Sequence, residues 1–152
     1  MQYSMGHRYV GQWRDNMKNG YGVMYYANGS VYAGNWENDK RQGKGTLTLK
    51  PGSPVEESYE GEWDNDVWHG HGKYCYPKRE GTVYEGDWVR GVRHGQGRLS
   101  FLDGSFYRGD FSQDQMHGRG VYVDVAAQSQ YDGEWVRNMR QGHGTCIEWD
   151  GR

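Results

Sequence analysis

The sequence predicts an all-β protein, an elongated single-layer solenoid of six antiparallel β-hairpins. Two observations predict it. The pattern Tyr-x-Gly-x-Trp recurs six times, once with Phe for Trp, and a Gly-x-Gly follows eleven residues after each leading tyrosine. The composition agrees, because the 152 residues include 25 Gly, 13 Tyr and 7 Trp but only 34% hydrophobic residues. A core must therefore be built from aromatic rings rather than from aliphatic side chains.

The repeats extend along the whole chain. Their leading tyrosines stand 23 to 27 residues apart. They are Tyr9, Tyr32, Tyr59, Tyr84, Tyr107 and Tyr131. We therefore treat residues 1–152 as one array. Neither end shows the polar cap that usually closes a repeat array, so we expect a fragment of a longer one, whose open strand edges favour self-association.

The first strand of each unit carries Tyr, Gly and Trp at alternating positions, the period that places side chains on one face of a strand. The intervening residues are polar, as at Glu60 and Glu62, and should face water. A single hairpin cannot bury its rings alone, so stacking between successive units should supply the core.

A polar loop of about six residues is expected between the Trp and the Gly-x-Gly, where the return strand should begin. Residues 23–26, 73–76 and 98–101 are examples of that strand. Tight turns are expected to close units at Asn28-Gly29, Asp103-Gly104 and Asp150-Gly151. No segment has helical periodicity.

Composition also argues against several classes of function. No apolar run is long enough for a membrane-spanning helix, and the N-terminus lacks an export signal, so we expect a cytoplasmic protein. The net charge of −2 argues against nucleic-acid binding. Cys75 and Cys146 are expected to be reduced and buried. No catalytic or nucleotide-binding motif is present, so we expect no enzyme and no cofactor.

Tyr-x-Gly-x-Trp followed by His-Gly-x-Gly, as in residues 84–97, resembles the MORN repeat, and the resemblance covers nearly the entire chain. It implies a twisted β-solenoid used as a scaffold or interaction surface, without catalysis where the repeats stand alone. Such arrays occur in cytoskeletal and ciliary proteins, at membrane contacts, and beside the catalytic domains of phosphoinositide kinases and some methyltransferases. Phe111, the Ala126-Ala127-Gln128 segment and short insertions in units two and three depart from the pattern.

The first candidate site is an aromatic groove. Most of the repeated rings should belong to the core, but a single-layer sheet cannot cover both faces, so some rings should stay partly exposed and anchor a partner peptide or helix. The groove residues are Tyr9, Trp13, Tyr32, Trp36, Tyr59, Trp63, Tyr84, Trp88, Tyr107, Phe111, Tyr131 and Trp135. This predicts a protein-binding scaffold that self-associates in a cytoskeletal or ciliary assembly.

The second candidate is a basic edge near the loop tips, which predicts instead a peripheral membrane adaptor for anionic phosphoinositides. Its residues are Lys18, Lys40, Arg41, Arg90, Arg93, Arg137 and Arg140. These charges also have a structural interpretation, pairing with acids of the next unit. A neighbouring polar-to-acidic column comprises Gln12, Asn35, Glu62, Asp87, Asp110 and Glu134.

Histidines precede the Gly-x-Gly in three successive units, at His69, His94 and His117. Equivalent atoms in successive units would be ~10 Å apart, too far for a shared metal ion. A loop-ordering hydrogen bond is therefore expected, and no metal site within the chain. A zinc site between two chains, using His69 with His71 or Cys75, remains a minor alternative.

Overall fold

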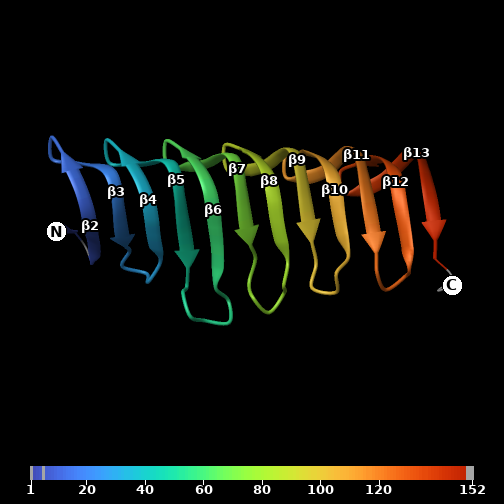
Figure 1. Ribbon diagram of the computed structural model, residues 1–152, viewed down its shortest axis with the longest axis horizontal. Coiled ribbons are helices and arrows are strands. Elements are labelled where there is room, and N and C mark those ends of the chain that lie inside the picture. The colour runs from blue at the N-terminus through green and yellow to red at the C-terminus, as the bar shows by residue number, and fades with distance from the viewer. Residues whose placement is uncertain (1, 5, 150–152) are drawn as a thin grey trace.

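The computed structural model describes residues 2–4 and 6–149. They form a single sheet of 13 strands in which each strand pairs antiparallel with the next one in the sequence (Figure 1). No described residue is helical. The all-β hairpin array expected from the sequence is therefore confirmed.

The strands are three to ten residues long. They are β1 (Gln2–Ser4), β2 (His7–Arg14), β3 (Met17–Tyr25), β4 (Val31–Glu37), β5 (Lys40–Leu49), β6 (Glu57–Asp64), β7 (Val67–Cys75), β8 (Val83–Val89), β9 (Val92–Ser100), β10 (Phe106–Ser112), β11 (Gln115–Asp124), β12 (Ser129–Val136) and β13 (Met139–Glu148). Each unit pairs an even-numbered strand with the odd-numbered one that follows it.

The turn inside each hairpin differs from expectation. The six-residue loop is wrong: Asp15 and Asn16 alone connect β2 to β3, with φ of 52° and 62°. Positive φ at both central residues matches the right-handed twist of the flanking strands, so a two-residue turn suffices. All six turns share this geometry, and the Gly-x-Gly consequently lies inside the return strand. The turn pairs are Asp15-Asn16, Asn38-Asp39, Asn65-Asp66, Arg90-Gly91, Gln113-Asp114 and Arg137-Asn138.

The turns between units lie at the opposite end of the strands, at the bottom of Figure 1. The expected tight turns at Asn28-Gly29 and Asp103-Gly104 are confirmed, since the N–H of Gly29 donates to the Tyr26 carbonyl and that of Gly104 to the Phe101 carbonyl, both at 3.0 Å. The Asp150-Gly151 turn lies outside the described residues.

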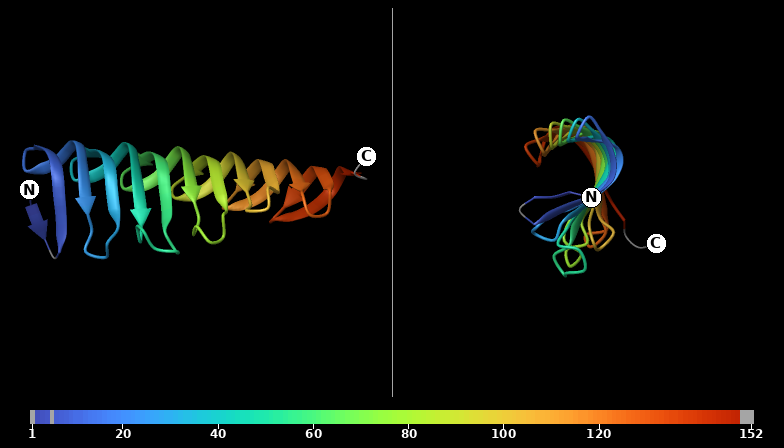
Figure 2. Two further views of the ribbon diagram at one scale, coloured as in Figure 1. Left: turned by 60° about the horizontal axis from the view of Figure 1, so that its bottom comes forward. Right: turned by 90° about the vertical axis from the view of Figure 1, so that its left-hand side faces the viewer.

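The sheet is elongated along its stacking direction, and its strands follow an open arc when seen end-on (Figure 2). Each unit contains a β-bulge that contributes to this curvature, because the register shifts between the Gly and the Trp of the first strand, as between Gly61 and Trp63. Curvature brings the Tyr and Trp of one strand together: the rings of Tyr59 and Trp63 lie 5.3 Å apart, edge to face. The next unit's Trp88 contacts Tyr59 at 5.5 Å.

A row of glycines crosses the sheet beneath these rings. Gly61 pairs with Gly45 on one side and Gly72 on the other, and the same pairing repeats along the array. The hydroxyl of Tyr59 crosses this row and donates to the Glu62 carbonyl at 2.8 Å, while the Trp63 indole donates to the Gly45 carbonyl at 3.0 Å. The buried polar atoms of the rings are thus satisfied by backbone carbonyls.

The two cysteines lie outside this core. Both are free thiols, but the expected burial is wrong, because Cys75 is half-buried and Cys146 is exposed. Cys146 belongs to β13, which pairs only with β12 among the described strands.

Candidate binding surfaces

The twelve rings expected to line a groove form the hydrophobic core. Eleven are at most 7% exposed, and Trp13 is 37% exposed. The first five leading tyrosines are each covered by the Trp or Phe of their own unit and by that of the following unit, and Tyr131 is covered by Trp135, so the rings offer no continuous surface to a partner. The rings are buried because the sheet is curved; the alternation of the strand only places them on the same face.

A long side chain from each return strand covers the rings on the same face. Lys18 Nζ lies 5.4 Å from the centre of the Trp36 ring, and Arg41 Cζ lies 4.7 Å from that of Trp63. These are cation–π contacts, and they shield the core from solvent. The residues at this position are Lys18, Arg41, Trp68, Arg93, Met116 and Arg140.

The same cations form ion pairs with the turn of the next unit. Lys18 lies 3.4 Å from Asp39, Arg41 lies 3.1 Å from Asp66, and Arg93 pairs with Asp114 at 2.6 Å. The backbone N–H of Arg41 also donates to Asp66 Oδ1 at 2.8 Å, and the N–H of Asp66 donates to the Arg41 carbonyl at 3.0 Å. The second turn residue therefore locks each unit to its predecessor.

The seven residues of the expected basic edge consequently divide into two groups. Lys18, Arg41, Arg93 and Arg140 lie on the aromatic face; Arg140 Cζ is 4.8 Å from the Tyr131 ring centre. The remaining three lie at or beside the turns and, like Arg140, are exposed to solvent. These are Lys40, Arg90 and Arg137.

The polar-to-acidic column lies at the bulges, where the side chains of five of its six residues accept a backbone N–H of the paired strand. Glu62 accepts the His71 N–H at 2.6 Å, and Asp87 accepts the Gln96 N–H at 3.0 Å. These amides follow glycines with positive φ, where the bulge interrupts regular strand pairing. The column is therefore a structural feature of the repeat.

Two of the three histidines before the Gly-x-Gly, His69 and His94, order the turn of the next unit, and the bond expected of His117 stays a prediction. His69 Nδ1 accepts the Arg90 N–H, and His94 Nδ1 accepts the Gln113 N–H, both at 3.2 Å. Asn19 accepts the Asn38 N–H in the same way in unit one. No cluster of three metal-ligating side chains occurs in residues 2–4 and 6–149. Zinc bound between two chains stays a prediction.

The outer face, opposite the rings, contains a surface that the sequence analysis missed. A hollow of about 840 Å³ crosses β3 to β8 along this face. Its lining includes Tyr21, Ala33, Thr46, His71 and Lys73. The hollow is open, with both polar and apolar lining, and it has room for an extended chain rather than for an enclosed small molecule.

The outer face of β2–β4 is apolar next to this hollow. Tyr21 is 56% exposed and Tyr25 42% exposed, and Val10 is exposed beside them. In the strand register, Val23 of β3 lies between Val10 of β2 and Ala33 of β4. We call Val10, Tyr21, Val23, Tyr25, Val31 and Ala33 the apolar patch. An apolar residue between the two glycines of Gly-x-Gly occurs only in unit one, and that signal could have identified the patch.

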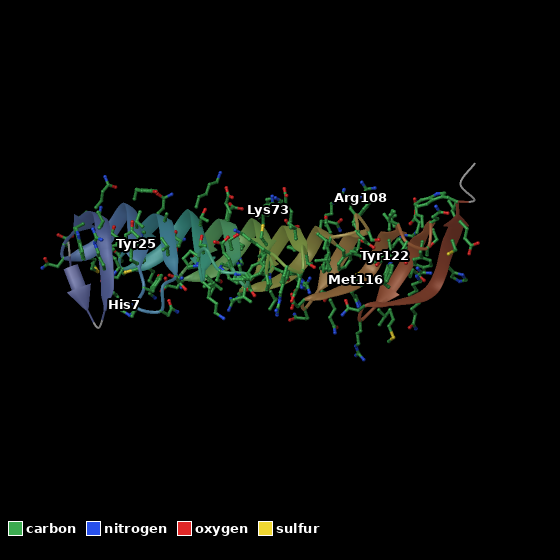
Figure 3. All side chains as sticks on the ribbon, turned by 90° about the horizontal axis from the view of Figure 1, so that it is seen from below. His7, Tyr25, Lys73, Arg108, Met116 and Tyr122 are labelled. Carbon is green, nitrogen blue, oxygen red and sulfur yellow. The ribbon has the colours of Figure 1, made fainter. Side chains whose placement is uncertain are left out.

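Beyond the patch the outer face is charged. Glu60 lies opposite Lys73, which lies opposite Glu85, which lies opposite Arg98. Figure 3 shows Lys73 and Arg108 along the same margin of the ribbon, with Met116 toward the other side. Opposite charges facing each other across strands stabilise a sheet modestly.

A third surface follows the two-residue turns of units three to six. Val67, Val89 and Met139 are exposed there, next to the exposed Arg90 and Arg137. We call these five residues the turn margin. Exposed apolar side chains combined with basic ones are typical of surfaces that bind the interface of an anionic membrane.

The fold and the surfaces define a repeat protein that consists of one sheet, whose outer face and turn margin are exposed to solvent. A sequence model of the MORN repeat matches six segments, residues 9–31, 32–53, 59–79, 84–106, 107–125 and 131–147. The chain belongs to the MORN repeat family, whose members are in general non-catalytic. A search among curated proteins found no match. Within the described residues there is no helix suited to crossing a membrane.

Proposed function

We propose that this chain is a non-catalytic scaffold that binds an extended segment of a partner protein on the outer face of its sheet. The hollow over β3–β8, continuous with the apolar patch at Tyr21 and Ala33, carries the proposal. Exposed tyrosines on a rigid sheet make good anchors, because they bury a large area and lose little conformational entropy on binding. The proposed setting is cytoplasmic, in a cytoskeletal or ciliary assembly.

Site-specific photo-crosslinking in cell extracts tests this proposal. A benzophenone side chain at Thr46, inside the hollow, should crosslink a defined partner protein, and Tyr21→Ser with Tyr25→Ser should abolish the product. The matched control is a benzophenone at the exposed turn residue Gln113. Crosslinks from Gln113 but not from Thr46 would contradict binding on the outer face.

Self-association through the sheet edges belongs to the same proposal. Among the described strands β13 pairs only with β12, and all ten of its residues are exposed. Light scattering should give a mass above that of one 17.6 kDa chain. A monomer at all concentrations tested would remove self-association while leaving partner binding intact.

The turn margin favours a second function, peripheral binding to membranes that contain anionic phosphoinositides. Each exposed cation near such a surface contributes ~1 kcal/mol, and the valines and methionine can enter the headgroup region. Co-sedimentation with phosphoinositide vesicles should weaken with salt and be lost in Arg90→Glu with Arg137→Glu. An equal loss of vesicle binding in Arg98→Glu with Arg108→Glu, on the outer face, would contradict membrane binding by the turn margin.

A further inference from the structure

Two arginines face each other on the outer surface. Arg98 of β9 and Arg108 of β10 are directly opposite in the strand register, and both are exposed. Like charges at directly opposed positions destabilise a sheet. The pair is an exception among the directly opposed residues of the outer face. Across β6 to β9 the charges alternate in sign, from Glu60 to Lys73, Glu85 and Arg98.

The surroundings leave this pair with one positive charge in excess, at Arg108. Glu85 on β8 lies opposite Arg98, whereas Arg108 has Val121 as its opposite neighbour on β11. Within the part of the chain that the structure describes, neither arginine forms an ion pair with a carboxylate. Arg119, two residues from Val121 on β11, is a third cation nearby, but it pairs with Asp132 at 3.7 Å and so adds no free charge.

Arg98 is held in a fixed orientation. Its guanidinium carbon lies 3.9 Å from the centre of the Phe106 ring, and its Nε is 3.4 Å from Ser100 Oγ. A guanidinium stacked on a ring keeps its outer N–H groups free for a carboxylate, and it loses little freedom when one binds. Arg98 is therefore oriented to accept an anion from solvent, with the exposed Arg108 directly opposite it.

We infer that Arg98 and Arg108 bind acidic side chains of the partner segment. The inference rests on the proposed function, because the arginines continue the outer face directly beyond the hollow. The separation from Tyr21 on β3 to Arg108 on β10 is seven strand spacings, ~34 Å. An extended peptide covers that distance with about ten residues. The segment thus carries an apolar or aromatic anchor for the apolar patch and Asp or Glu roughly ten residues away.

Random 16-residue peptides displayed on phage, selected against the intact chain, test the inference. Selected peptides should combine an aromatic or aliphatic residue with acidic residues about ten positions away. The affinity of one such synthetic peptide should fall by about tenfold in Arg98→Gln with Arg108→Gln. Arg90→Gln with Arg137→Gln, which removes the same charge from the turn margin, should change it less than about twofold.

A charge swap makes the test sharper. Arg98→Glu with Arg108→Glu should bind the peptide whose acidic residues are replaced by Lys, and circular dichroism should show an unchanged fold. Peptides that bind through Tyr21 but ignore both arginine variants would overturn the inference and leave the proposed function standing. Peptides whose affinity does not change in Tyr21→Ser or Thr46→Lys would overturn both the inference and the proposed function. Loss of vesicle binding, rather than of peptide binding, in Arg98→Gln with Arg108→Gln would also overturn it.

Discussion

The phenol ring of Tyr84 occupies the space that a side chain at Gly97 would need. Gly97 lies opposite Gly86 on the paired strand, and the Tyr84 hydroxyl passes over both to donate to the Asp87 carbonyl at 2.8 Å. The second glycine of each Gly-x-Gly is in the same position beneath the tyrosine of its own unit. The tyrosine of each repeat therefore requires a glycine at this position, because its ring fills the space of a side chain there.

Gly97→Ala should consequently destabilise the chain strongly. A Cβ atom at Gly97 would overlap the Tyr84 ring and hydroxyl, and overpacking of this kind costs about 3 kcal/mol. The loss should appear in urea denaturation followed by tryptophan fluorescence. An unchanged unfolding midpoint would show that the ring does not lie against the glycine.

Gly91→Asn should stabilise the chain. Gly91 has φ of +84°, and a Cβ atom there would meet no other atom within 4 Å. Asn138 occupies the equivalent turn position, and its Oδ1 accepts the Met116 N–H at 2.9 Å. A new hydrogen bond to the Trp68 N–H is worth about 1 kcal/mol. The unfolding midpoint should rise; a decrease would show that the turn position is not equivalent among units.

The hydrogen bond of His69 can be tested with a substitution that the chain already uses elsewhere. His69→Asn should preserve the bond to the Arg90 N–H, because Asn19 performs this role in unit one, whereas His69→Leu removes the acceptor. Amide exchange measured by NMR should therefore be faster at Arg90 in the Leu variant only. Equal exchange in the two variants would contradict the assignment.

Alkaline pH should unfold the chain cooperatively. Burial raises the pKa of nine tyrosines above the usual value of 10.0: Tyr9, Tyr26, Tyr32, Tyr59, Tyr74, Tyr76, Tyr84, Tyr107 and Tyr122. A raised folded-state pKa gives stability that is fully present below pH 10 and is lost as pH rises above it. Each such tyrosine contributes a slope of up to ~1.4 kcal/mol per pH unit.

Denaturation midpoints between pH 8 and 11, together with tyrosinate absorbance, measure this effect. The buried tyrosines should ionise in one step as the chain unfolds. Gradual ionisation of all tyrosines near pH 10, with the fold intact, would show that the rings are exposed to solvent.

The sequence was sufficient for the number of hairpins and for the face that Tyr59 and Trp63 share, because strand alternation and repeat spacing determine both. It did not reveal that curvature would bring these two rings into contact, since the bulge between Gly61 and Trp63 depends on pairing with the next strand. The two-residue turns of units four to six were hard to predict because Arg90, Gln113 and Arg137 are unusual at positive φ, whereas the Asn and Asp residues at the turns of units one to three are typical there.

The candidate surfaces were harder to predict than the fold. The sequence indicated that the cations could pair with acids of the next unit, but it did not identify the partners, which are the turn residues Asp39, Asp66 and Asp114. The hollow on the outer face was not predictable, since it depends on how six strands lie together. Tyr21 carried a signal, being the aromatic exception at a position that is otherwise polar.

The central claim is that the rings of the repeat are core and that the outer face is the surface available for binding. Tyrosine nitration of the folded chain, mapped by mass spectrometry, tests it most directly. We expect modification at Tyr21 and Tyr25, which are exposed, and protection at the six leading tyrosines of the repeats, which are buried. Nitration of Tyr32, Tyr59 or Tyr84 as fast as that of Tyr21, in the folded protein, would contradict the account.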